Sequence, residues 1–210
     1  MIIRNEEEKG FRAVEELTKT AFWNVNVPGC DEHYLVHVLR GHPDFVPELD
    51  FVLEEDGKII GNILYTRAKL VDEEGNEKNV LTFGPLCVHP DYQRRGYGKK
   101  LQTHSFARAV EMGYDTVVIF GNPENYVATG FKNGKRFHVG VGDVYPVALL
   151  VKELTDGALD GRKWRYVESA AYAIDEAAAE AFDRDFPQME KAYLPSQELF
   201  YIYSHATVTR

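Results

Sequence analysis

The residues whose types and spacing could do chemistry lie in one turn, Gln93-Arg94-Arg95-Gly96-Tyr97-Gly98-Lys99-Lys100. The apolar stretch before it, Leu81 to Val88, predicts a strand, and the spacing of apolar and small residues after it predicts a helix from Tyr97. A helix start offers free backbone N–H groups, and Gly96 and Gly98 leave room for a phosphate to reach them. Four positive charges stand beside this turn in a chain of net charge −9. The sequence therefore predicts an anion-binding site.

Three segments, in order, carry a resemblance to a known family. Gln93 to Gly98 matches the Gln/Arg-x-x-Gly-x-Gly/Ala signature of the GNAT (GCN5-related) N-acetyltransferases. A predicted strand, Thr116 to Phe120, comes next, and the segment from Tyr126 to Phe131 resembles the family's Tyr-x-x-x-Gly-Phe end. The intervening Gly121-Asn122-Pro123 is similar to that of YhbS-type predicted acetyltransferases. By resemblance, the chain is identified as a GNAT N-acetyltransferase of the YhbS type.

The resemblance implies the GNAT acyl-CoA N-acyltransferase fold, an α/β (α+β) mixed sheet whose fourth and fifth strands splay apart. It also implies acetyl-CoA as the acyl-donor substrate, with its pyrophosphate on the glycine-rich turn and its pantetheine arm paired with a strand backbone. The implied coenzyme-binding residues are Leu86, Cys87, Val88, Gln93, Arg94, Arg95, Gly96, Tyr97, Gly98, Lys99, Asn122, Pro123 and Tyr126.

The resemblance further implies that Tyr126 is the catalytic residue facing the departing thiolate. A tyrosine of pKa ~10 cannot favourably protonate a thiolate whose conjugate acid has a pKa of ~8.5, a mismatch of about 2 kcal/mol. We therefore expect Tyr126 to donate a hydrogen bond to the developing charge rather than to transfer its proton completely.

No general base follows from the sequence. Some GNAT members place a glutamate on the motif strand, but Asn79 to Val88 contains none. Glu124 and His138 are near in sequence, and neither is assigned. The predicted activity is transfer of acetyl to a primary amine of an unidentified small-molecule or peptide acceptor by direct attack in a ternary complex. The alternative is a non-catalytic acyl-CoA binding or sensing module.

Other combinations of residues are weaker signals. His33 and His37 lie at i, i+4 spacing that can hold zinc, but no third ligand is well placed, so no metal is expected. Cys87 and His89 share one strand face, which is the arrangement that a thiol nucleophile and its base require. The glycine-rich turn lacks the third glycine of a dinucleotide fingerprint and the Ser or Thr of a P-loop.

Composition limits the class of protein. With 210 residues, the chain is expected to hold a GNAT domain over 1–155 and a small C-terminal extension over 156–210, packed on or beside it. No run of 18 apolar residues or basic leader is seen, and two cysteines suggest reduced thiols, so a cytoplasmic protein without a membrane partner is expected. The acidic charge argues against nucleic acid and mildly favours a cationic amine acceptor. A monomer or a homodimer is expected.

Hydrophobic spacing predicts the remaining elements. They are helices over Gly10 to Trp23, Asp31 to Leu39 and Ile174 to Phe186, a hairpin of Leu49 to Glu54 with Lys58 to Val71, and a closing hairpin of Phe137 to Val141 with Val144 to Leu154. Asp31 and Asp175 are expected to cap helices, and Gly113 to end the helix that follows the glycine-rich turn. The acceptor is expected beside the Asp31–Arg40 helix, the loop to Leu49 and the aromatic tail, with Trp23, Tyr34 and His37 as plausible lining.

Overall fold

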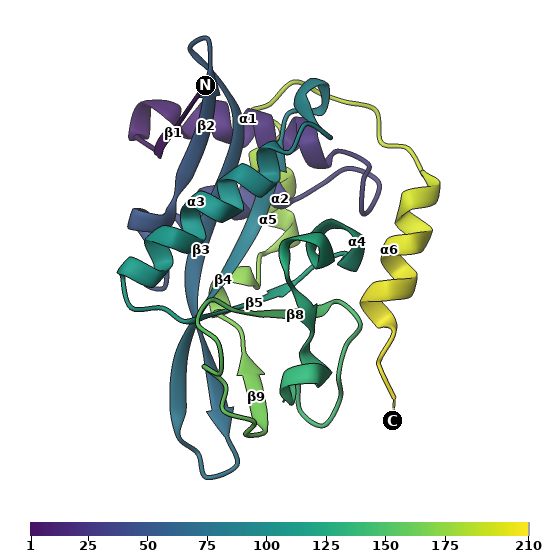
Figure 1. Cartoon of the computed structure of the whole chain (residues 1–210). Coiled ribbons are helices and arrows are strands. Elements are labelled where there is room, and N and C mark those ends of the chain that lie inside the picture. Colours follow the sequence, from purple (N-terminus) through teal and green to yellow (C-terminus); the bar gives the residue numbers. More distant parts are fainter. Residues whose placement is uncertain (210) are drawn as a thin grey trace.

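A mixed β-sheet runs through the molecule in the order β1-β2-β3-β4-β5-β8-β6, with β9 pairing with β3 and β7 (Figure 1). The computed structural model describes residues 1–209. The strands are β1 (Ile2–Asn5), β2 (Phe51–Glu55), β3 (Lys58–Asp72), β4 (Glu77–Val88), β5 (Thr116–Phe120), β6 (Lys132–Asn133), β7 (Val139–Gly140), β8 (Leu149–Glu153) and β9 (Trp164–Val167).

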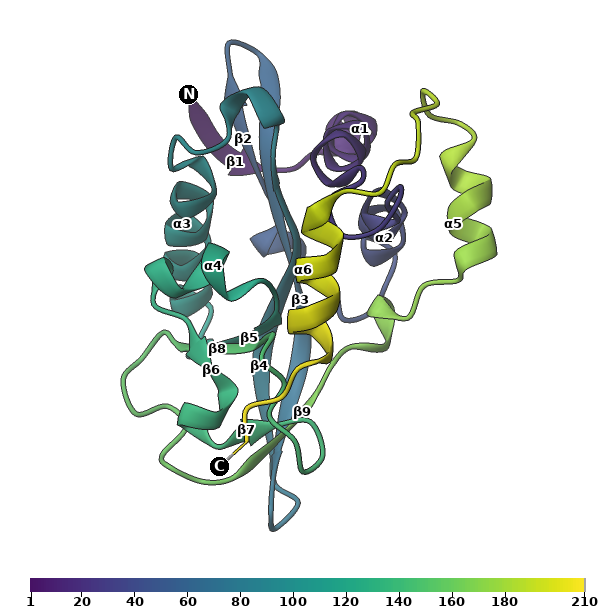
Figure 2. The same ribbon diagram turned by 90° about the vertical axis from the view of Figure 1, so that its right-hand side faces the viewer.

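Helices cover both faces of this sheet. They are α1 (Phe11–Phe22), α2 (Glu32–Leu39), α3 (Tyr97–Glu111), α4 (Pro123–Tyr126), α5 (Glu176–Asp183) and α6 (Pro195–His205), with 3-10 turns at 8–10, 47–49, 90–92, 127–129, 134–137 and 170–172. Figure 2 shows α3 on one face of the sheet and α1 and α2 on the other, with α5 outside α2. The α/β architecture with a mixed sheet, predicted from the sequence, is confirmed.

The alternation of side chains along β3 explains the two layers. Ile63 and Tyr65 belong to the core beneath α3, together with Leu101 of that helix. Leu64, between them, points to the opposite core, which contains Val14 of α1. Because every one of these side chains is fully buried, both faces of the sheet are apolar and each must be covered by a helix.

The strands β4 and β5 part in the middle of the sheet. They run parallel and are in register at Leu81 and Val117. From there β5 continues beside β8, with Val118 opposite Val151, and Figure 1 shows the two turning away from β4. Within residues 1–209, no strand pairs with β4 beyond Leu81 on the side that faces β5. The predicted splay therefore leaves the Thr82–Val88 backbone open along one edge.

The predicted closing hairpin is wrong in its pairing. The strand β7 pairs in parallel with β9, and β8 pairs with β5 and β6. Val141 and Val144 do close a tight turn, but the chain beyond it does not return along β7. Pro146 lacks an N–H for a ladder, and the backbone around it pairs with the C-terminal segment instead: Val208 N–H donates to Tyr145 O (2.8 Å) and Val147 N–H to Ala206 O (2.8 Å).

The other predicted elements lie within a few residues of their predicted bounds. Asp175 caps α5, since its Oδ1 accepts a hydrogen bond from Ala178 N–H at 2.7 Å. Gly113 follows α3 with a φ of +89°, as a left-handed cap requires. Asp31 precedes α2, but its side chain makes no capping hydrogen bond. No segment of residues 1–209 forms a helix with the length and apolarity needed to cross a bilayer.

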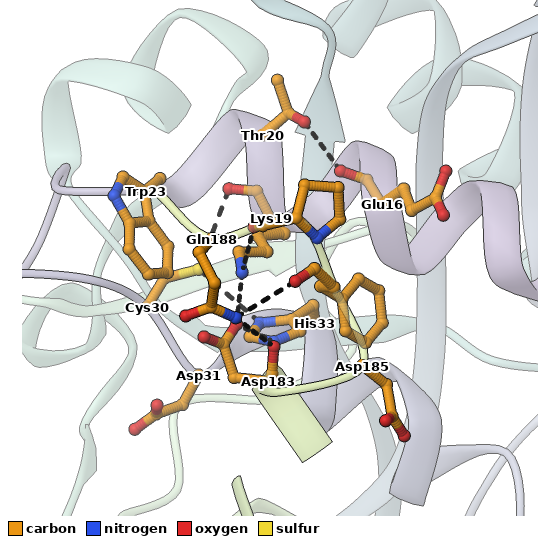
Figure 3. Close-up of polar contacts among 12 residues, drawn as sticks. Glu16, Lys19, Thr20, Trp23, Cys30, Asp31, His33, Asp183, Asp185 and Gln188 are labelled. Atoms are coloured by element: carbon orange, nitrogen blue, oxygen red, sulfur yellow. Dashed lines mark hydrogen bonds and ion pairs between the residues drawn. The ribbon is translucent and has the colours of Figure 1, made fainter. Parts of the chain in front are cut away.

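A buried polar cluster fixes α5 to α1 and α2 (Figure 3). Lys19 Nζ of α1 donates to Asp183 Oδ1 (2.5 Å) and to Pro187 O (3.0 Å). His33 Nε2 of α2 lies 3.0 Å from the same Asp183 oxygen. Since the Lys19 side chain is only 3% exposed, its charge depends on Asp183 for compensation. The cluster anchors the segment that follows β9 against the N-terminal half of the chain.

Candidate active site

The glycine-rich turn forms an open cradle of backbone N–H groups. Gly96 has a φ of +80° and Arg94 a φ of +60°, so the chain doubles back just before α3 begins. Lys100 N–H makes the first intrahelical hydrogen bond, to Gly96 O at 3.0 Å. The N–H groups of residues 97–99 precede that bond and have no partner within the helix. They are therefore available as hydrogen-bond donors, which is the arrangement that the predicted anion site requires.

The side chains of the turn leave this cradle accessible. Arg94, Arg95 and Lys99 are exposed. Gln93 turns back, and its Nε2 donates to Val88 O at 3.0 Å, which ties the turn to the end of β4. A β-carbon on Gly96 would meet no atom within 4 Å, so this position is open as well as left-handed. The cradle and the free edge of β4 are thus contiguous.

Cys87, which lies on that edge, is not suited to nucleophilic chemistry. Its thiol is buried 3.6 Å from Thr18 Oγ1 of α1. Burial, as the largest cause, raises the pKa of Cys87 to about 12, so the thiol stays protonated. His89 Nδ1 accepts a hydrogen bond from Asp91 N–H at 3.3 Å. The Cys87 thiol is thus taken up by the core. A ligand on this segment would meet the half-buried Leu86 side chain and the outward-facing backbone groups, apart from Val88 O, which already accepts from Gln93 Nε2.

Tyr126 lies at the far end of the same edge, on the short helix α4. Asn122 caps that helix by accepting from Glu124 N–H at 3.0 Å, and Pro123 occupies its first turn. The Tyr126 ring packs at centroid distances of 5.7 Å from Phe83 and 5.8 Å from Phe131. Burial, with a smaller contribution from Tyr203, raises the pKa of Tyr126 to about 12. The phenol therefore stays protonated and is a hydrogen-bond donor.

A cavity of about 470 Å³ opens beside Tyr126, where β4 and β5 diverge. Of the residues implied by the resemblance, Leu86, Asn122 and Tyr126 line it, whereas the 93–99 turn lies outside it. The opposite wall comes from α2, α6 and the residue after β9, through Glu32, Leu35, Phe200, Tyr203 and Glu168. The site is thus a cavity at one end of an open strand edge, with the cradle at the other.

Three residues predicted to line the acceptor site do not line this cavity. Trp23 Nε1 donates to Glu190 O at 2.9 Å, away from the cavity. Tyr34 and His37 pack on Phe182 of α5, with ring centroids 5.4 Å and 4.6 Å from it. The sequence indicated the right helix but the wrong face, because α5 covers the face on which Tyr34 and His37 lie. The loop before Leu49 does not reach the cavity either.

Glu168 is the functional candidate that sequence reasoning missed. It follows β9 and lines the cavity, and although the residue as a whole is exposed, neighbouring atoms crowd its carboxyl and partly desolvate it. This desolvation raises the pKa of Glu168 to about 7. Glu168 reaches the site because β9 pairs with β3, with Val167 opposite Lys69. No local sequence motif indicates this pairing, so no pattern in the sequence pointed to Glu168. Glu124 and His138, named from proximity in sequence, do not line this cavity.

The two histidines at i, i+4 spacing, His33 and His37, lie beside different carboxylates. His33 is buried beside Asp183, and its Nδ1 lies 3.7 Å from Cys30 Sγ. His37 Nδ1 lies 3.0 Å from Glu15 Oε1. Among residues 1–209, no group of three or more His, Cys, Asp or Glu side chains is arranged to hold a metal ion.

Comparison with known proteins identifies the family. Residues 12–132, more than half of the chain, match the sequence model of the Acetyltransferase (GNAT) family. The chain belongs to the GNAT acetyltransferase family. Its N-acetyltransferase relatives include YhbS of Escherichia coli K12, itself uncharacterized, at 31% identity over 152 residues, which cover 65% of this chain and 87% of YhbS. Uncharacterized YjhQ of the same organism is 33% identical over 86 residues, 41% of this chain, and the match spans only 47% of YjhQ.

Two solved structures share the fold of this GNAT protein. E. coli YhbS in complex with CoA superposes with a TM-score of 0.71 at 23% identity, covering 82% of this chain and 92% of YhbS. A GNAT family acetyltransferase from Brucella melitensis in complex with acetyl-CoA gives a TM-score of 0.63 at 24% identity, covering 81% of this chain and 97% of that one. The family resemblance read from the turn at 93–98 is confirmed.

Proposed function

We propose that this GNAT protein transfers an acetyl group from acetyl-CoA to a primary amine held in the cavity beside Tyr126. The observation that carries the proposal is the continuous path from the N–H cradle, along the unpaired edge of β4, to Tyr126. An anion site at one end and a hydrogen-bond donor at the other suit a donor with a pyrophosphate and a distant thioester.

The donor contacts follow from that path. The N–H groups at the start of α3, with Arg94, Arg95 and Lys99, bind the pyrophosphate, and the backbone of Leu86–Val88 pairs with the pantetheine amides as an added strand does. Asn122, Pro123 and Tyr126 lie at the thioester end. Complexes of fold neighbours with CoA and acetyl-CoA support this assignment of the ligand.

The transfer is a direct attack in a ternary complex. An amine of pKa ~10.4 is almost wholly protonated at pH 7, and freeing it costs about 4.6 kcal/mol. Glu168 takes one proton from the ammonium and passes it to solvent, and the freed nitrogen attacks the thioester carbonyl carbon. The C–S bond breaks with its electron pair on sulfur, where the Tyr126 phenol donates a hydrogen bond. The nitrogen's second proton goes to the thiolate, which leaves amide and CoA thiol.

The alternative, an acyl-CoA binding or sensing module without turnover, draws on the missing glutamate of β4. One experiment separates the two: purified protein is titrated with CoA by calorimetry and assayed for thiol release from acetyl-CoA against a panel of primary amines. Binding together with amine-dependent thiol release supports the proposal. Binding without release from any amine points to the sensing module, and absence of CoA binding contradicts both.

A further inference from the structure

The cavity beside Tyr126 has an unbalanced electrostatic lining. Its charged side chains are the carboxylates Glu32 and Glu168, and no Lys, Arg or His from residues 1–209 lines it. Glu32 accepts hydrogen bonds from Asn26 Nδ2 (3.1 Å) and Asp31 N–H (3.2 Å), both of them neutral donors. Within the described chain, neither carboxylate forms an ion pair. Two negative groups thus share a cavity that contains no compensating cation.

The partial desolvation of both carboxyl groups makes this imbalance costly in the empty protein. Desolvation raises the pKa of Glu32 and that of Glu168, which means that both charged forms are disfavoured where they stand. A cation that entered the cavity would relieve the cost and gain charge-assisted hydrogen bonds. An anionic group on a ligand would instead meet two carboxylates and no positive side chain.

The rest of the wall is mainly apolar and much of it is aromatic, with a few neutral polar side chains such as Asn26 and Asn125. Phe22, Phe120, Tyr172, Phe200 and Tyr203 contribute to it. Such rings contact an apolar body well, and their faces attract an ammonium within about 6 Å. The volume of about 470 Å³ is that of a small-molecule site, and the thioester end of the donor must share it. The remaining space suits a compact acceptor rather than a long polyamine.

We propose that the acceptor is a compact primary amine on an apolar, preferably aromatic, body that carries no carboxylate. Its ammonium group is bound by Glu32 and Glu168. This proposal rests on the proposed acetyl transfer. Amines of the phenethylamine type belong to this class. The corresponding α-amino acids do not, because their carboxylate would find no cation in the wall.

Three probes that share one body test this proposal: phenethylamine, phenylalanine and 2-phenylethanol. Binding to the full chain, with and without CoA, is measured by calorimetry at pH 8. We expect phenethylamine to bind at least tenfold more tightly than either of the others. Equal or tighter binding of phenylalanine, equal binding of 2-phenylethanol, or no binding of phenethylamine would overturn the proposal.

Variants show whether the named carboxylates are responsible. Glu32→Gln and Glu168→Gln should each weaken phenethylamine binding about tenfold and leave 2-phenylethanol binding unchanged. Glu180→Gln, on the exposed side of α5, is the matched control and should change neither. If both cavity variants bind phenethylamine as the wild type does, the carboxylates are not its site.

The thiol-release assay keeps this proposal separate from the proposed function. Acetylation of amino acids or long polyamines in preference to phenethylamine would overturn the acceptor class and leave acetyl transfer standing. Tight binding of phenethylamine by the protein, with no thiol released from acetyl-CoA by any amine, would overturn acetyl transfer and leave the binding class standing.

Discussion

The ring of Tyr126 lies so close to the backbone of Gly121 that a β-carbon at position 121 would come within 2.6 Å of ring atom Cε2. The absence of a side chain at 121 thus lets the tyrosine ring occupy its place in the cavity wall, where the proposed function puts the thioester. Gly121→Ala should displace the ring and lower kcat about tenfold or more, since misplacement of a catalytic group by about 1 Å is that costly. Steady-state kinetics with Gly41→Ala as control, whose β-carbon would meet only Val38 O at 3.7 Å, checks this. An unchanged kcat in Gly121→Ala would show that the ring position does not matter.

Removing the Tyr126 hydroxyl tests the chemistry rather than the position. Tyr126→Phe keeps the ring contacts with Phe83 and Phe131 and deletes the hydrogen bond that we propose to the leaving thiolate. We expect kcat to fall about 10²-fold, while the Kd for CoA stays within about twofold. Stopped-flow and calorimetric measurements give the two quantities. Unchanged turnover with a confirmed acceptor would remove Tyr126 from the mechanism.

Two glycines with the same backbone requirement make a matched test of the donor cradle. Gly96 has a φ of +80° and Gly75, in the β3–β4 turn, a φ of +86°, and a β-carbon at either meets no atom within 4 Å. Gly96→Glu should abolish CoA binding, because its carboxylate competes with the pyrophosphate for the free N–H groups. Gly75→Glu carries the same backbone strain and should bind CoA normally. Equal loss in both variants would trace the effect to folding instead.

The raised pKa of Glu168 predicts the pH dependence. A general base acts in its ionised form, so kcat/KM should rise with pH through about 7 as Glu168, flanked by Tyr166 and Tyr172, loses its proton. Glu168→Gln should lower kcat/KM about 10²-fold and remove that limb of the profile. Rates across pH 5.5–9 in both proteins are compared with those of the Glu180→Gln control. A limb near pH 7 that persists in Glu168→Gln would assign the proton to another group.

The cluster around Asp183 predicts a change in stability. Asp183→Ala leaves the Lys19 ammonium buried with Pro187 O as its remaining hydrogen-bond acceptor. Because Asp183 is itself 19% exposed, we expect a loss of about 2 kcal/mol, below the range for a fully buried pair. Asp185→Ala, an exposed neighbour just after α5, should cost less than about 0.5 kcal/mol. Urea unfolding of the two variants measures the difference, and equal stabilities would contradict this account.

Local patterns carried much of the sequence prediction. The geometry of the turn at 93–98 depends on local residues, because glycine at 96 permits the left-handed backbone that precedes α3. The β2–β3 hairpin and α5 likewise follow from nearby turn and capping residues. Tyr126 was located by its spacing from Gly130 and Phe131, and the structure places it in the wall of the cavity.

The features that were mispredicted or missed depend on contacts between segments that are distant in the sequence. The closing hairpin was mispredicted because residues 145–147 pair with the C-terminal segment at 206–208, some 60 residues away. Glu168 gave no signal because its place depends on β9 pairing with the far end of β3. The face of α2 that lines the cavity could not be known before α5 was seen to cover the other. Such long-range pairings leave no trace in local spacing.

The wall opposite Tyr126 has a consequence for how this protein can diversify. Residues 12–132, which match the family, contain the cradle, the open edge of β4 and Tyr126. Glu168, Tyr172, Phe200 and Tyr203 lie beyond that span, in the last quarter of the chain. Under the proposed function, substitutions there would alter one part of the acceptor wall, while Glu32 and Leu35 of α2, which lie within the matched span, keep the other part. Residues 168–204 are therefore the region to exchange first in engineering a new specificity, because they form part of the wall and lie outside the segment that holds the cradle, the open edge of β4 and Tyr126.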